Sequence, residues 1–183
     1  MSETLVFPFS VGDRTQSDLL GGKGANLAEM VRIGLPVPPG FTITPQACRE
    51  FLSSGSMPSG LQHEIDAALQ DLEASLGKEF GNPDKPLLVS VRSGAKFSMP
   101  GMMETVLNVG MTPAVAQSMA EQTGNPRFAW DSYRRFVDMY GRIVCDVEPE
   151  EFHKIEARIL STFGVAGIPE LDVPGLQALA NGY

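Results

Sequence analysis

The segment Leu87-Leu88-Val89-Ser90-Val91 constrains the fold most, because it is a short and nearly continuous apolar run. Such a run is typical of a central β-strand that is buried on both faces. Before it, residues 61–80 repeat apolar side chains at the spacing of one long amphipathic helix. After it, Thr105 to Val109 is again β-prone. The mixture of strand and helix patterns predicts an α+β fold.

The first half of the chain adds further elements of both kinds. Thr4 to Phe9 and Phe41 to Ile43 are β-prone runs. Gly21-Gly22-Lys23-Gly24 precedes a helical pattern that ends at Gly34, so we expect a flexible turn that leads into a helix N-terminus. Thr44 followed by a proline predicts a capped helix start.

After Gly110 the sequence contains only helical patterns. They cover Pro113 to Gln122, Arg127 to about Val144 and Pro149 to Phe163, with Thr112 and Asn125 placed as caps. We therefore predict one subdomain over residues 1–111 and a helical subdomain over residues 112–183. The last twenty residues show one weak helix and no clear core pattern, so we expect the second subdomain to be truncated at its C-terminal end.

Composition excludes several classes of protein. The 183 residues carry 22 Asp and Glu against 14 Lys and Arg, a net charge of −8, which argues against a nucleic-acid surface. No uninterrupted apolar segment is long enough to predict a membrane span or an export signal. Cys48 and Cys145 lie far apart within helical patterns, where a buried reduced thiol is the usual state. We expect a cytoplasmic protein without a disulfide or zinc.

Lys23 is a candidate phosphate-binding residue. Small glycines, a helix N-terminus and an ammonium group together suit an anion. The spacing is not that of a P-loop, which requires GxxxxGK followed by Ser or Thr. A solvent-exposed lysine in a turn is the alternative interpretation, and the GGKG motif alone does not decide between them.

Arg92 is a second candidate, because it ends the apolar run and enters a glycine-containing loop. We expect its guanidinium to find an anion, since the alternative is a charge left close to the core. A phosphate and a structural ion pair with an acidic residue remain equally open. The loop that follows, Ser93 to Glu104, is rich in glycine and methionine, which suits either a lid over a nucleotide or packing of the core.

Other chemistry that phosphoryl transfer requires is not evident. Magnesium is normally held by several carboxylates, and Glu104 is the only acidic residue of the loop. His63 and His153 lie among charged neighbours in helical patterns, so we expect both on the surface rather than as phosphate acceptors. We predict no catalytic and no metal-binding residue within the chain.

Five segments resemble the start of the pyruvate, phosphate dikinase family, and the resemblance as a whole covers nearly the entire chain, thinning after about residue 150. They are GGKGANLAEM (21–30), GLPVPPGF (34–41), SVRSGA (90–95), MPGMMETVLN (99–108) and FAWDSYRRF (128–136). The first and third are shared with related enzymes such as phosphoenolpyruvate synthase. The last two look specific to the dikinase.

The resemblance implies the N-terminal part of an ATP-grasp nucleotide-binding domain with an inserted helical subdomain. It implies that Lys23 and Arg92 contact the ATP phosphates, and that Gly101, Met103 and Thr105 belong to a loop over the triphosphate.

In this family ATP phosphorylates a histidine on a swivelling domain, and a C-terminal barrel passes the phosphoryl group to pyruvate. The resemblance places the magnesium ligands, the phosphohistidine and the pyruvate site in domains beyond this chain, supplied in cis or in trans. The alternative is a truncated module that binds a nucleotide or a partner without turnover.

Overall fold

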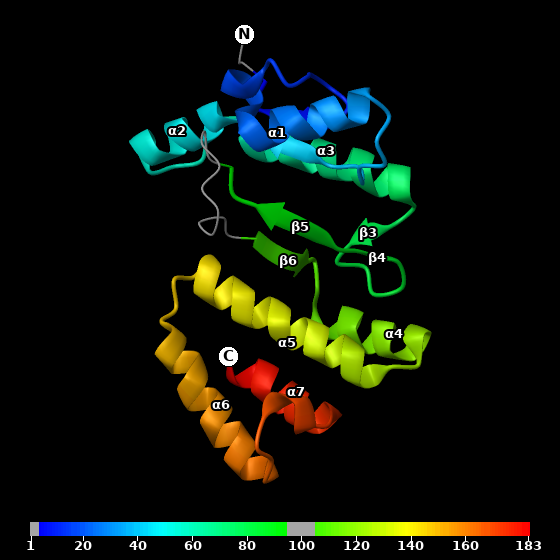
Figure 1. The fold of residues 1–183 in the computed structure, drawn as a ribbon, viewed down its shortest axis with the longest axis vertical. Helices are drawn as coiled ribbons and strands as arrows, with labels where there is room; N and C mark the ends of the chain where they lie inside the picture. Colours follow the sequence, from blue (N-terminus) through cyan, green and yellow to red (C-terminus); the bar gives the residue numbers. More distant parts are fainter. Residues whose placement is uncertain (1–3, 95–104) are drawn as a thin grey trace. The chain divides into compact units, whose positions relative to one another are not determined.

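The computed structural model describes residues 4–94 and 105–183. Packing contacts group the chain into two units: unit 1 is Met1–Gly77 with Ser93–Met103, and unit 2 is Lys78–Arg92 with Glu104–Tyr183. Helices and small sheets occur in both, which confirms the α+β class (Figure 1). The domain boundary predicted after residue 111 stays a prediction.

Unit 1 contains a two-stranded sheet and three helices. In chain order they are β1 (Val6–Pro8), α1 (Ser17–Arg32), β2 (Phe41–Ile43), α2 (Pro45–Ser54) and α3 (Leu61–Leu76). The strands are antiparallel, with Val6 opposite Ile43, so the two strands predicted in this region are confirmed. Helix α3 packs against β1, and Leu5, Val6, Ala47 and Leu61 form the buried core between them. The Glu64 carboxylate accepts hydrogen bonds from the backbone N–H groups of Leu5 and Val6 at 2.8 and 2.9 Å.

Helix α1 ends as predicted but begins earlier than predicted. Gly34 has φ 82°, its N–H donates to Val31 O, and the N–H of Leu35 donates to Met30 O, which together form a Schellman motif. The GGKG segment lies within the bounds of α1, but its first glycine is not helical, so the helical stretch that carries Lys23 begins directly after Gly21, close to the predicted helix start. One residue alone departs from helical geometry: Gly21 has φ 71° and ψ 161°, values open to glycine, and produces a kink.

The other helix boundaries of unit 1 follow from local chemistry. Thr44 caps α2 by accepting a hydrogen bond from Ala47 N at 3.4 Å, as the sequence predicted. Helix α3 was predicted to reach residue 80, and that is wrong. Gly77 takes a left-handed conformation with φ 62° and ends α3, after which Glu79 and Phe80 form a short strand.

Unit 2 begins with short strand pairs. They are β3 (Glu79–Phe80) with β4 (Pro86–Leu87), and β5 (Val89–Arg92) with β6 (Thr105–Val109). The prediction of a central strand buried on both faces is wrong. Leu87 is buried, but Val91 is 54% exposed, and β5 has a single neighbouring strand among the described residues. A register shift and Asn108 at φ 59° mark a bulge in β6.

Helices form the rest of unit 2, at the positions predicted from the sequence. They are α4 (Pro113–Thr123), α5 (Pro126–Ile143), α6 (Pro149–Phe163) and α7 (Val173–Gly182), with a short 3₁₀ turn at Ile168–Glu170. Thr112 and Asn125 cap α4 and α5 with their side-chain oxygens, which confirms both predicted caps.

The last twenty residues were expected to show no clear core pattern, and that is wrong. This C-terminal segment contributes to the core of unit 2. Leu171, Leu176 and Leu179 are at most 1% exposed and pack in one cluster with Trp130 and Val115. Asp172 caps α7 by accepting from Gly175 N at 2.9 Å. The C-terminal Tyr183 donates its hydroxyl to Glu156 at 2.6 Å, and burial together with this carboxylate raises the pKa of Tyr183.

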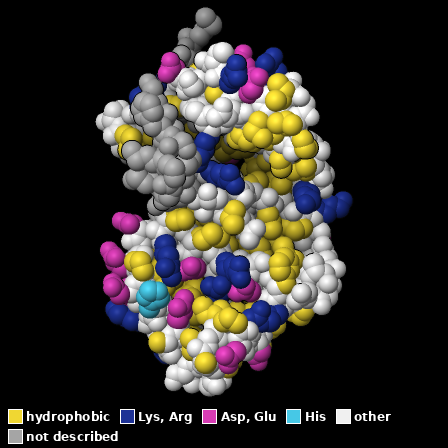
Figure 2. All heavy atoms as spheres, in the orientation of Figure 1, with side chains coloured by type: hydrophobic (Ala, Val, Ile, Leu, Met, Phe, Trp, Pro, Cys, Tyr) yellow, Lys and Arg dark blue, Asp and Glu magenta, His cyan; other side chains and the backbone are white. Residues whose placement is uncertain are grey.

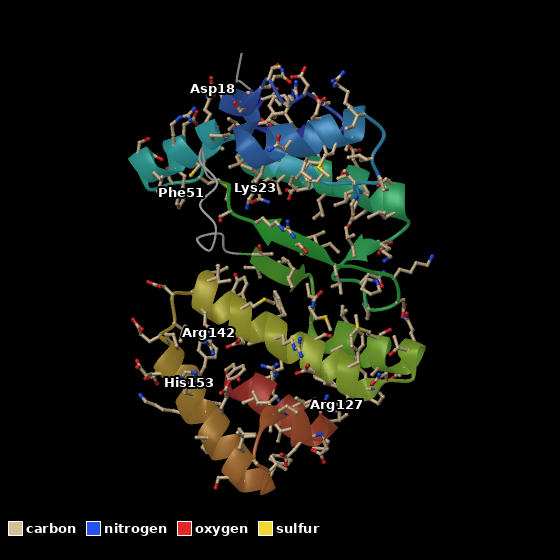
Figure 3. All side chains as sticks on the ribbon, viewed as in Figure 1. Asp18, Lys23, Phe51, Arg127, Arg142 and His153 are labelled. Carbon is tan, nitrogen blue, oxygen red and sulfur yellow. The ribbon has the colours of Figure 1, made fainter. Side chains whose placement is uncertain are left out.

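The predicted burial of the cysteines is wrong, whereas the predicted exposure of the histidines is confirmed. Cys48, within α2, and Cys145, just after the end of α5, are both exposed free thiols. His63 and His153 are exposed, and Figure 3 shows His153 projecting from α6. Throughout the described ranges every helix is too short or too polar to span a bilayer.

We expect Leu176→Ala to lower the free energy of unfolding by about 2–5 kcal/mol, because it opens a cavity in a side-chain cluster that excludes water. Leu52→Ala is the matched control, since Leu52 is 75% exposed, and it should change stability by less than about 0.5 kcal/mol. Urea denaturation followed by circular dichroism measures both. Equal effects of the two variants would contradict a core role for α7.

Candidate functional site

Lys23 projects from α1, just after the kink (Figure 3). Two of the three glycines around it have structural roles that involve no ligand. Gly21 supplies the positive φ of the kink. Gly24 is buried, and a Cβ placed on it would lie 2.8 Å from both Cγ2 and Oγ1 of Thr42, so its absence lets α1 approach β2 closely. The kink and the helix contact therefore explain two glycines of this motif without a ligand.

The Lys23 ammonium has one acceptor in the described part of the chain. It donates to the backbone carbonyl of Ser93 at 2.6 Å, within unit 1. Lys23 is half-buried, and no described carboxylate forms an ion pair with it. Its positive charge is thus held in place by a neutral group and is not neutralised. Lys23 therefore lies in a helix rather than in a turn, and its ammonium has a backbone partner.

Arg92 and Thr105 lie opposite each other where β5 pairs with β6 in unit 2. Directly opposed residues of an antiparallel pair project to the same face, so the guanidinium and the hydroxyl share one side of this sheet. Arg92 is exposed, which corrects the expectation of a charge near the core. No hydrogen bond or ion pair of its side chain is found within residues 4–94 and 105–183. The structural ion pair considered from the sequence is therefore not formed in that part of the chain.

Two predicted site residues, Gly101 and Met103, lie outside the described residues. The sequence expectation of a lid in residues 93–104 falls largely on the same segment. Within the ranges that are described, no group of three His, Cys, Asp or Glu side chains is arranged to hold a metal ion.

Sequence reasoning missed the acceptor of Lys23 and the contact of Gly24. A backbone carbonyl cannot be identified from side-chain patterns, so Ser93 offered no signal. The contact of Gly24 did leave one: Gly24 and Ala28 lie four residues apart on one face of the helix and are both small and buried, which is typical of a helix that packs closely.

Comparison with known proteins matches most of the chain to one family. A family model described as "Pyruvate phosphate dikinase, AMP/ATP-binding domain" matches residues 17–75 and 49–128. The chain is 50% identical over 175 residues to pyruvate, phosphate dikinase 2 of Oryza sativa, covering 95% of this chain and 20% of the relative. It is 46% identical over 179 residues to pyruvate, phosphate dikinase of Clostridium symbiosum, covering 97% and 20%. The chain therefore spans about a fifth of the length of these curated relatives.

We expect Gly24→Ala to destabilise unit 1 by about 1–3 kcal/mol, because the new methyl group meets Thr42 at 2.8 Å. Alanine is a better helix former than glycine by about 1 kcal/mol, so the sign of the effect tests the contact. Combining it with Thr42→Ala should recover most of the loss. Thermal denaturation of the two single variants and the double variant measures this coupling.

Asn26→Ala, at an exposed position of the same helix, is the control and should change stability by less than about 0.5 kcal/mol. If the effects of Gly24→Ala and Thr42→Ala simply add, the close approach of α1 to β2 at this point is not what glycine provides.

Proposed function

The chain belongs to the pyruvate, phosphate dikinase family and matches its N-terminal AMP/ATP-binding portion, and from this premise we propose that Lys23 and Arg92 each bind phosphate oxygens of ATP. The observation that carries the proposal is the state of the Lys23 side chain. A half-buried ammonium that has a carbonyl neighbour and no carboxylate partner among the described residues is suited to receive an anion.

Ion pairs involve only some of the basic side chains. Acidic residues outnumber basic ones, 22 to 14, and five ion pairs between side chains are formed within the described part. The contact of the Lys23 ammonium with the Ser93 carbonyl therefore carries more weight than the lack of an ion pair. Lys23 and Arg92 are both at family motif positions, and neither has an ion pair within the described part, which keeps both charges available for phosphate.

The side chains of Lys23 and Arg92 would contact phosphate oxygens in different ways. The Lys23 ammonium carries three N–H donors, so it can retain the Ser93 carbonyl and still donate to a phosphate oxygen. The planar guanidinium of Arg92 presents paired donors that match two phosphate oxygens at once. The Thr105 hydroxyl, on the same face of the sheet as Arg92, adds a neutral donor. Gly101 and Met103 remain proposed members of the triphosphate loop.

The activity of the relatives is a wider proposal, because the chain spans about a fifth of their length. We propose that it contributes the ATP-binding part of a reaction in which ATP, pyruvate and phosphate give AMP, phosphoenolpyruvate and diphosphate. The ATP-grasp architecture, magnesium, the phosphohistidine and the pyruvate site belong to this proposal, and the last three are assigned to polypeptide other than residues 1–183. A cytoplasmic location stays a prediction.

We expect Lys23→Ala and Arg92→Ala each to weaken ATP binding by about tenfold or more, which is the size expected for a charge-assisted hydrogen bond. Adenosine lacks the phosphates, so its affinity should not change in either variant. Isothermal titration calorimetry of the 183-residue chain with ATP, AMP and adenosine measures these differences. Arg92→Lys should bind more weakly than the parent chain, since it keeps the charge and loses the paired donors.

Lys85→Ala and Arg49→Ala are matched controls, because both side chains are exposed and neither forms an ion pair within the described residues. They remove the same charges elsewhere and should leave ATP affinity within about twofold, as expected for distant exposed charges screened by salt. If the controls weaken ATP binding as much as the site variants do, the effect is one of net charge. If the folded chain binds no ATP, the half-site proposed here is wrong.

A further inference from the structure

Unit 1 carries a surface hollow of about 260 Å³ that plays no part in the proposed phosphate site. It is lined by the C-terminal half of α1, the end of β1, the segment 37–40 and one face of α3. Ala68, Asp71, Leu72 and Ser75 share that face, because they are spaced three, four and seven residues along the helix. All of these elements belong to unit 1.

The wall of the hollow is fixed by packing and by backbone hydrogen bonds. The N–H of Phe9 donates to Gly40 O at 2.9 Å, which joins the end of β1 to the segment before β2. A Cβ on Gly40 would lie 2.5 Å from the ring of Phe9, so glycine is what leaves room for that ring in the wall. Because its walls are held in this way, the hollow is formed before any ligand arrives.

The lining is mostly apolar and carries one negative charge. Phe9, Val31, Val37 and Leu72 supply much of the apolar surface, and Asp71 is the charged residue among the described residues that line the hollow. Its carboxylate has no hydrogen bond or ion pair in the described part of the chain. Helix α3 bears four acidic residues and no lysine or arginine, so the surroundings also favour a cation.

The size of the hollow and the character of its rim indicate what fills it. An apolar cavity of about 150 Å³ accepts benzene, so 260 Å³ accommodates one large side chain with little room for more, and small-molecule pockets are commonly larger, about 300–1,000 Å³. Exposed apolar residues continue beyond the lining at Val11, Ile33, Leu35 and Leu76. In Figure 2, apolar atoms gather over the part of unit 1 that contains α1 and α3.

We propose that this hollow, named here the Asp71 hollow, binds a polypeptide segment in which a large apolar side chain is flanked by lysine or arginine. The apolar side chain enters the hollow, a flanking cation lies against Asp71, and neighbouring residues of the segment cover the exposed apolar rim. A small organic cation would leave that rim exposed to water. The proposal does not depend on nucleotide binding.

The probe is a short synthetic peptide with one central phenylalanine between pairs of lysines, added to the 183-residue chain and followed by backbone amide chemical shifts in NMR spectra. We expect saturable shifts at residues that line the hollow and at the rim. Asp71→Asn should weaken binding about threefold, as for a solvent-exposed ion pair, and added salt should do the same. Ser75→Trp, which places a large ring at the mouth from an exposed position, should abolish binding.

Asp66→Asn is the matched control, because Asp66 is exposed on α3 and is not part of the lining, and it should leave the affinity unchanged. Peptides with glutamate in place of lysine, or alanine in place of phenylalanine, should not bind. The proposal is overturned if these peptides bind equally well, if Asp66→Asn matches Asp71→Asn, or if shifts map elsewhere. It is also overturned if phenethylammonium binds as tightly as the peptide, since the hollow is then a small-molecule site.

Discussion

The close approach of α1 to β2 is the contact on which the arrangement of unit 1 depends. Gly24 lies against Thr42 without a side chain of its own, and the kink at Gly21 brings the rest of α1 onto the sheet. Lys23 sits between these two glycines, so its backbone is fixed by helix packing rather than by a ligand. A binding group that is held on a packed helix loses less conformational freedom when its ligand arrives, which makes this position suitable for an anion.

The side-chain caps of helices were the most predictable part of the structure, because they depend on chemistry between near neighbours, whereas the start of α1 and the end of α3 were not predicted. Thr44, Thr112 and Asn125 cap their helices with the side-chain oxygens expected of them, and Gly34 ends α1. What depends on distant contacts was predicted poorly. The exposure of Val91 depends on what packs over the face of β5, and the burial of Leu176 follows from packing by α4, α5 and α6. Neither is present in a local pattern.

For the candidate site, the sequence identified the cations and their chemical class but not their surroundings. Lys23 was noticed because glycines surround it, although two of those glycines turn out to serve the kink and the helix contact. Arg92 was noticed for a burial that it does not have. The more useful observations are the contact of the Lys23 ammonium with the Ser93 carbonyl and the pairing of Arg92 with Thr105. Both are properties of the folded chain that side-chain patterns in the sequence do not contain.

Helix α1 also separates the two surfaces proposed for unit 1. Lys23 lies in its first half, and Val31, which lines the Asp71 hollow, lies eight residues later, about 12 Å along the axis at the rise of an α-helix. A phosphate held at Lys23 and a side chain held beside Val31 therefore do not compete for space. Their charge preferences are opposite, because the first surface presents an ammonium and the second a carboxylate. A net charge of −8 opposes the approach of a nucleotide and favours that of a basic segment, so short-range contacts must carry nucleotide binding while long-range attraction assists the hollow.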